Sequence, residues 1–267
     1  MYGYSLGISR LYGSGSYIDP DALAFITAAS ITDSTQKSAI NQLVIDLKND
    51  NIWTKLPAVY PFVGQSATST KFNLKDPQDT DAAFRITWNG GITYTNGVLS
   101  NGTNGYGNTH FIPSINSTNN STSLGYKSTT NAGGSYAEFG AFSTGRFAIY
   151  NFSGAESANQ YNSSAGDGAI TATQTDTSGF YIASRTASNS FKLFRNAVQL
   201  GSTATGAGGS VSDIAIELYI GALNNAGSAA LFTPRNLTFA FIGDGLSDTD
   251  VFNLTTAVNT LDTTLGR

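Results

Sequence analysis

Two spacings of apolar residues divide the chain at about residue 57. Before this point, apolar residues recur every three or four positions, as on one side of a helix. Asp19 can cap a first helix with Pro20 in its opening position, and Thr32 or Asp33 can cap a second. The apolar side of the second predicted helix carries Ile40, Leu43, Val44 and Leu47. Both predicted helices are short and apolar on one side only, so we expect them to pack on a larger surface.

After Pro57 the spacing of apolar residues changes to two, which is typical of strands. In "FRITWN" the alternation places Phe84, Ile86 and Trp88 on one face. In "IAIELYIGAL" it places Ile214, Ile216, Leu218 and Ile220 inward, with Glu217 and Tyr219 outward. Further strands are predicted at "YAEFGAF", "RFAIYNF", "GFYIAS", "FKLF" and "LTFAFIG", separated by Gly, Asn and Ser clusters. Many short strands without helices between them predict a sandwich or a barrel.

One more helix is predicted at the end of the sequence. Ser247 and Asp250 have the spacing of a capping box, and an apolar stripe follows at Val251, Leu254, Val258, Leu261 and Leu265. The predicted fold class is therefore all-β, with a short N-terminal helical pair and a C-terminal amphipathic helix.

Composition narrows the possible partners. The 267 residues can bury a large core, and 29 Gly with 12% charged residues suit a turn-rich β protein. A net charge of −4 without basic clusters argues against nucleic acid as a partner, and no apolar run approaches a membrane span. The chain has no Cys and no predicted cofactor. The opening "MYGYSLGISRLYG" does not have the pattern of a secretory signal.

The segment "FKLFRNAVQLGS", followed by "IAIELYIGALNNAGSAALFTPRNLTFAFIGDGLSDTD" and a helix, resembles the closing half of a concanavalin A-like lectin/glucanase jelly roll of the laminin-G sort. The helical segment ending in "WTKLPAVYPFVG" and the following "KFNLKDPQDTDAAFRITWNGG" resemble the version found in tailed-bacteriophage virion proteins. This resemblance covers about residues 18–267. It implies a β-sandwich jelly roll, but the fold hosts lectins, hydrolases and structural modules alike.

The resemblance also suggests how the chain is divided. We expect an N-terminal arm at 1–17, a helical segment at 18–56 that packs on the sandwich, and the jelly roll at 57–267. One departure concerns a hairpin. The expected Asn-Gly turn reads Asn196-Ala197, and Ala disfavours the positive φ of a type I′ turn, so the hairpin is predicted but its turn type is not.

Catalytic residues are not evident. Hydrolases similar to this family place two or three carboxylates two residues apart on one strand. The glutamates here are Glu138, Glu156 and Glu217, and none has a carboxylate two residues away. Glu138 is interpreted as a residue on the wet face of a strand. The expectation is that the chain is not an enzyme and has no catalytic residues.

His110, the single histidine, lies in "VLSNGTNGYGNTHFIPS". Its neighbours are Gly, Asn and Thr, with no acid or base beside it in sequence. We interpret residues 101–107 as turns and 109–112 as the entry to a strand, which gives His110 a structural role on a face or at an edge.

Two weaker signals concern ligands. Asp76, Asp79 and Asp81 lie within six residues and offer oxygen ligands for Ca²⁺, although the spacing matches no known calcium loop and a Pro-containing turn explains it as well. Loop tyrosines beside Asn and Ser suit sugar rings and hydroxyls, and the candidates are Tyr94, Tyr106, Tyr126 and Tyr161. Tyrosines that pack at strand edges would give the same pattern.

These observations favour a non-enzymatic virion structural protein of a tailed bacteriophage, as a capsid decoration, tail or fibre component. The first alternative is a receptor-binding module for a host-surface glycan, and a weaker one is a polysaccharide-degrading enzyme. Expected partners are other virion proteins and further copies of the chain, with a trimer assumed by analogy with fibres, and the expected location is the virion.

Overall fold

The computed structural model describes residues 17–152, 155–162, 169–206 and 208–267, with only the backbone described at 151, 152 and 155–162. The predicted arm at 1–17 lies almost entirely outside these residues. The α-helices are α1 (Pro20–Ala28), α2 (Ser34–Asn49), α3 (Ala67–Thr70), α4 (Pro113–Asn116) and α5 (Asp248–Leu265). Short 3₁₀ turns are η1 (Trp53–Lys55), η2 (Asp81–Ala83) and η3 (Val211–Asp213). No helix among the described residues is long and apolar enough to cross a membrane.

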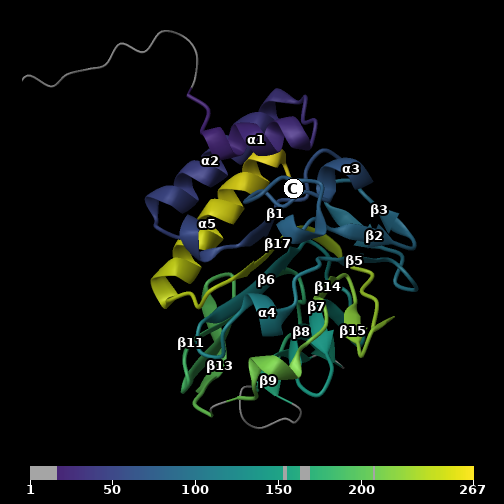
Figure 1. Ribbon diagram of the computed structural model, residues 1–267, viewed down its shortest axis with the longest axis vertical. Coiled ribbons are helices and arrows are strands. Elements are labelled where there is room, and N and C mark those ends of the chain that lie inside the picture. Colours follow the sequence, from purple (N-terminus) through teal and green to yellow (C-terminus); the bar gives the residue numbers. More distant parts are fainter. Residues whose placement is uncertain (1–16, 153–154, 163–168, 207) are drawn as a thin grey trace, which may run out of the picture.

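The strands form two sheets stacked face to face (Figure 1). The first sheet has the order β13-β12-β11-β6-β17-β4-β3, with β1 also paired to β17. Its strands are β1 (Ala58–Tyr60), β3 (Ile92–Thr93), β4 (Val98–Ser100), β6 (Thr122–Ser128), β11 (Gly179–Ala187), β12 (Ser190–Arg195), β13 (Val198–Ala204) and β17 (Asn236–Gly243).

The second sheet has the order β10-β9-β8-β7-β14-β5-β2. Its strands are β2 (Thr87–Asn89), β5 (Tyr106–Asn108), β7 (Tyr136–Phe142), β8 (Arg146–Phe152), β9 (Ala155–Asn162), β10 (Ala169–Thr173) and β14 (Tyr219–Ile220), with the hairpin β15 (Leu223–Asn225) and β16 (Ser228–Ala230) joined to β7. All pairings are antiparallel except that of β15 with β7. This architecture confirms the predicted all-β sandwich with a C-terminal helix.

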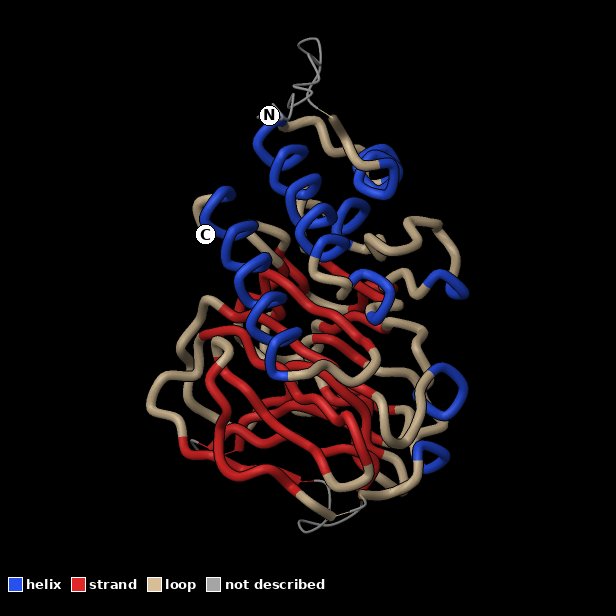
Figure 2. The backbone as a smooth tube through the Cα atoms, turned by 90° about the vertical axis from the view of Figure 1, so that its left-hand side faces the viewer, coloured by secondary structure: helices blue, strands red, loops and turns tan. Residues whose placement is uncertain are grey.

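Alternate residues of the first sheet belong to different cores. In β17, Phe239 and Phe241 pack with the helices, whereas Ala240 and Ile242 pack between the two sheets. Strand β11 divides in the same way, with Phe180 on the helix side. The helices α1, α2 and α5 therefore cover the outer face of the first sheet, and Figure 2 shows the long helices lying against one side of the stacked strands.

Capping residues start the helices where the sequence predicts them. The Asp19 carboxylate accepts a hydrogen bond from the Asp21 amide and pairs with Lys48 of α2 at 2.6 Å, so it joins α1 to α2. In α5, Ser247 and Asp250 form the predicted capping box, and Asp250 also pairs with Lys55 at 2.7 Å. A cap and an apolar stripe are local signals, which explains why these helices are readable from sequence.

The C-terminal end of α5 is fixed by buried charges. Asp262 is 2% exposed and accepts from Arg267 Nε at 2.7 Å and from Lys127 Nζ of β6 at 2.8 Å. The Arg267 guanidinium also donates to the carbonyls of Pro61 and Thr238. Because every one of these charges has a partner, burial does not leave an isolated ion.

Two predicted strands differ from the structure. Residues 214–223 keep the inward alternation, with Ile214, Leu218 and Ile220 buried, but regular pairing is limited to β14 and β15. At the start of "FRITWN", Phe84 has a φ of 58° and ends the η2 turn, so the strand begins only at Thr87. A residue in the left-handed region cannot continue an extended strand.

The Asn196-Ala197 hairpin forms the turn that Ala disfavours. Asn196 and Ala197 have φ values of 50° and 64°, and Arg195 pairs directly with Val198. Two central residues with positive φ define a type I′ turn. The methyl group of Ala197 therefore occupies a strained backbone position.

Candidate functional site

An open cleft lies beside β5 and β14, at one border of the second sheet. It has a volume of about 460 Å³ and is lined by Asp81, Ala82, Phe84, His110, Ile112, Ile115, Asn116 and Glu217. Asp81 and Phe84 come from the η2 turn, Ile115 and Asn116 from α4, and Glu217 from the segment before β14. The volume is in the range of small-molecule sites in proteins.

His110 enters this cleft because the backbone is distorted there. The Thr109 amide donates to the Leu218 carbonyl and the Leu218 amide donates to the Phe111 carbonyl, so the pairing passes over His110. His110 has a φ of 57°, and its amide donates to the Asn108 side chain at 2.9 Å. An irregularity of this kind redirects a side chain, as bulges do at the borders of sheets. The expected strand entry at 109–112 is therefore wrong, since the regular strand is β5, which ends at Asn108.

The His110 ring is held by two polar groups. Its Nε2 atom is 2.8 Å from Thr87 Oγ1 and 3.4 Å from Asp81 Oδ1, and 18% of its side chain is exposed. Within the described part of the chain no group bonds to Nδ1. His110 thus lies outside the regular strands and lines the cleft, a position that its neighbours in the sequence do not indicate.

Two of the three aspartates considered as calcium ligands take part in ion pairs. Asp79 is 2.6 Å from Lys71 Nζ, and Asp81 is 2.8 Å from Arg85 Nη2. The hydrogen bond from Lys71 holds the pKa of the Asp79 carboxyl below its usual range. Asp76 is exposed and apart from these contacts. Among the residues with described side chains, no group of three or more His, Asp or Glu is close enough to hold a metal ion.

Two stacked tyrosines lie on β5 and β14, and one of them, Tyr219, is close to Glu217. The ring centroids of Tyr106 and Tyr219 are 4.6 Å apart. Only 7% of Tyr219 is exposed, although the alternation of inward and outward residues in this segment places it on the outward side. Burial raises the pKa of Tyr219, and Tyr106 and the carboxylate of Glu217 raise it further. The Glu217 charge therefore acts on the outer face of the second sheet. No hydrogen bond or ion pair within the described residues engages this carboxylate.

The structure separates the four tyrosines predicted to contact sugars. Tyr126 is fully buried and stacks on Tyr181 inside the sandwich at 5.4 Å, so it cannot contact a ligand and that prediction is wrong. Tyr94 is half-buried against Trp88. Tyr106 stacks on Tyr219 and is not among the residues that line the cleft, and its role stays a prediction. Tyr161 lies in β9, and its side chain is outside the described residues.

Glu138 is not on a wet face. It is fully buried, and its Oε1 atom accepts from Arg235 Nη1 at 2.7 Å. Arg235 also donates to the Ala132 carbonyl at 2.8 Å. The sequence could not indicate this position because Arg235 is almost a hundred residues away along the chain. The buried pair orders the loop between β6 and β7.

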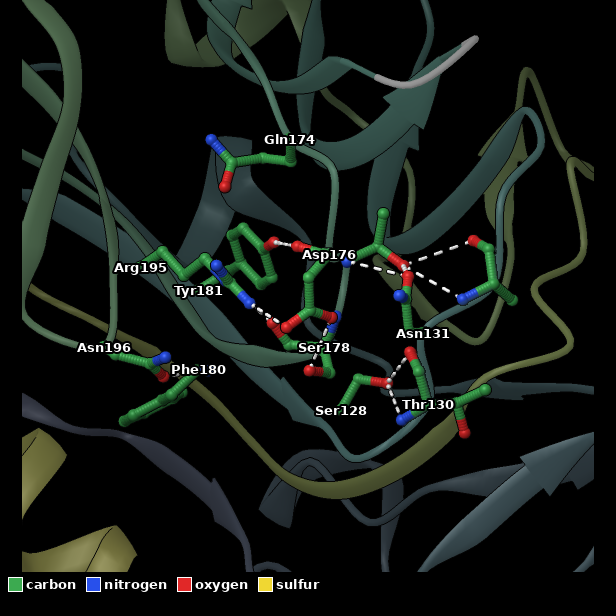
Figure 3. A network of polar contacts seen from close by, with 12 residues as sticks. Ser128, Thr130, Asn131, Gln174, Asp176, Ser178, Phe180, Tyr181, Arg195 and Asn196 are labelled. Carbon is green, nitrogen blue, oxygen red and sulfur yellow. Dashed lines mark hydrogen bonds and ion pairs between the residues drawn. The ribbon is translucent and has the colours of Figure 1, made fainter.

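A second polar cluster holds the neighbouring loop, before β11 (Figure 3). The Asp176 carboxylate accepts from the Ser178 amide at 2.9 Å and from its hydroxyl at 2.8 Å, and Arg195 Nη2 donates to it at 2.7 Å. The Ser178 amide and hydroxyl, together with Arg195, lower the pKa of Asp176. Both carboxylate oxygens are occupied, so we assign this cluster to loop structure.

Comparison with known proteins gives a fold and no family. No protein-family model matches the chain, and no curated protein matches it. Among solved structures, the Trypanosoma rangeli sialidase matches with a TM-score of 0.54 at 11% identity, over 84% of this chain and 40% of the sialidase. A structure of botulinum neurotoxin type C, whose cell entry depends on interaction with two ganglioside molecules, matches with a TM-score of 0.53 at 11% identity, over 78% of this chain and 52% of that one.

These likenesses support a lectin-like β-sandwich and correct one expectation. Sialidases are enzymes, and they stand among the structures that share this fold, so the expectation that the chain is not an enzyme is overturned. The chain spans only 40% and 52% of the lengths of these two proteins. The concanavalin A-like family and the phage origin remain predictions from the sequence.

Proposed function

We propose that this chain binds a glycan in the cleft formed by η2, α4 and the segment before β14. The observation that carries this proposal is the pairing of polar and apolar walls in one open cleft. Glu217, Asn116 and His110 offer polar atoms, while Phe84, Ile112 and Ile115 offer apolar surface. Sugars present both hydroxyl groups and apolar C–H faces, so they need both kinds of contact.

The polar groups have capacity left for a ligand. The Asn116 side chain uses its oxygen to accept from the Ile112 amide at 3.1 Å, which leaves its NH₂ group available as a donor. The Glu217 carboxylate can accept hydrogen bonds from sugar hydroxyl groups. His110 Nδ1 can form a hydrogen bond with a further hydroxyl group of the sugar. Three groups with different donor and acceptor properties can fix the orientation of one sugar ring.

The apolar wall is exposed before any ligand binds. Ile115 is 73% exposed in the short helix α4, the largest exposed fraction among the large apolar side chains of the described residues. A bound sugar face would remove part of this surface from water, which is favourable. The shared fold with a neurotoxin that interacts with gangliosides adds general support.

Substitution of Ile115 tests the proposal. Ile115→Ser should weaken binding of the best ligand on an immobilised glycan panel about tenfold, which corresponds to about 1.4 kcal/mol of lost apolar contact. The matched control is Phe252→Ser, which changes a 62% exposed side chain on α5 and should leave the affinity unchanged. Equal affinity of wild type and Ile115→Ser, or no binding to any glycan of the panel, would refute the assignment.

We further propose, from the sequence resemblance over residues 18–267, that this glycan-binding chain is a component of a tailed-bacteriophage virion. A host-surface glycan would then be its ligand, and a homo-oligomer, taken as a trimer, its assembled form. Antibody labelling of purified particles should place the chain on the capsid, tail or fibre. A polysaccharide-degrading activity is the alternative, and new reducing ends released from bacterial polysaccharides would support it.

A further inference from the structure

The charges around the cleft do not balance. Lys71 and Arg85 pair with Asp79 and Asp81, so these four groups contribute no net charge. Among the residues whose side chains the structure describes, none forms an ion pair with Glu217, and neither Lys nor Arg is among those that line the cleft. One carboxylate therefore remains without a counter-charge at the site where a ligand would sit.

Groups facing Glu217 from the neighbouring elements do not neutralise it. Tyr219 and Tyr106 on β14 and β5 are uncharged hydroxyl groups, and the Glu217 charge raises the pKa of Tyr219. The Nε2 atom of His110 faces Thr87 and Asp81. The contacts of the His110 ring are therefore made with these two residues and not with Glu217. Asn224 donates to the backbone carbonyl of Glu217 at 2.8 Å and leaves the carboxylate untouched.

We propose that Glu217 makes this cleft select uncharged sugars and reject sugars that carry a carboxylate at the bound residue. The inference rests on the proposed glycan binding and specifies its substrate class. An uncharged sugar can donate hydroxyl hydrogen bonds to Glu217, and a bond to a charged acceptor is stronger than one between neutral groups. The carboxylate of an acidic sugar brings a like charge into the cleft and has no proton of its own to donate to Glu217, which disfavours binding.

Matched pairs of methyl glycosides measure the effect directly. The two members of each pair differ only at C6, which is a hydroxymethyl group in the neutral sugar and a carboxylate in the acid. The pairs are glucose and glucuronate, galactose and galacturonate, and mannose and mannuronate. In low salt, the uncharged member of the bound pair should bind at least about tenfold more tightly than the acid. The ratio should fall in 0.5 M salt, because screening weakens repulsion between partly exposed charges.

Glu217→Gln is the decisive variant, since it keeps the shape and removes the charge. Its preference for the uncharged member should fall below about threefold, while its melting temperature stays that of the wild type. Asp50→Asn removes a carboxylate at the end of α2 and should keep the wild-type ratio. Equal or tighter binding of the acids by the wild type, or an unchanged ratio in Glu217→Gln, would overturn the inference while glycan binding stands. Absence of binding to every member of these pairs, while a glycan of the immobilised panel still binds, would overturn this inference, and absence of binding to the whole panel would overturn the proposed function itself.

Discussion

Replacing Leu254 tests whether the helical layer is part of the folded core. Leu254 is fully buried in the cluster that joins α2, α5 and the phenylalanines of β11 and β17. In such a position Leu→Ala removes apolar contacts and leaves a cavity, for a cost of about 3 kcal/mol. For a chain of this size that cost lowers the melting temperature by about 5–6 °C.

The assay is urea unfolding followed by far-ultraviolet circular dichroism. Leu254→Ala should lower the midpoint without changing the slope, which would show that stability fell and the amount of surface exposed on unfolding did not. Phe252→Ala is the matched control on the same helix, because its side chain is 62% exposed, and its free energy of unfolding should change by less than about 0.5 kcal/mol. If Leu254→Ala costs less than about 1 kcal/mol, or if both variants cost the same, α5 does not pack as described.

Two further predictions concern the hairpin and the loop before β11. Ala197→Gly should raise the free energy of unfolding by about 0.5–1 kcal/mol, because relief of the positive-φ strain exceeds the added chain entropy of Gly; an unchanged or lower value in the same urea assay would contradict the type I′ turn. Asp176→Asn should destabilise the protein at pH 7, and the difference from wild type should shrink as the pH falls below the ordinary pKa of aspartate. The pKa of Asp176 is depressed in the folded protein, so its contribution to stability is present above the ordinary aspartate pKa and is lost as the pH falls through the folded value; a difference that stays constant from pH 7 to pH 2 would contradict this.

Local signals explain what the sequence could predict. Asp19 and Ser247 begin helices through contacts a few residues away, and the alternation in 236–243 depends on one strand alone. The cleft depends on Asp81, His110 and Glu217, which come together only after β2, β5 and β14 pair. His110 seemed to have no acid nearby because its acid is 29 positions earlier in the chain. Tyr126 was misjudged for the same reason, since its burial against Tyr181 depends on the pairing of β6 with β11.

The placement of α1, α2 and α5 on a single sheet gives the molecule two dissimilar sides. The central strands β11 and β17 of the first sheet are buried on both faces, whereas the cleft lies at a border of the second sheet and none of its lining residues belongs to α5. The sequence has no Cys, so a cysteine introduced at the exposed Thr256 of α5 would provide the single thiol of the chain for chemical attachment. A sensor coated through that thiol would hold every copy in the same orientation, attached through a helix that contributes no residue to the cleft.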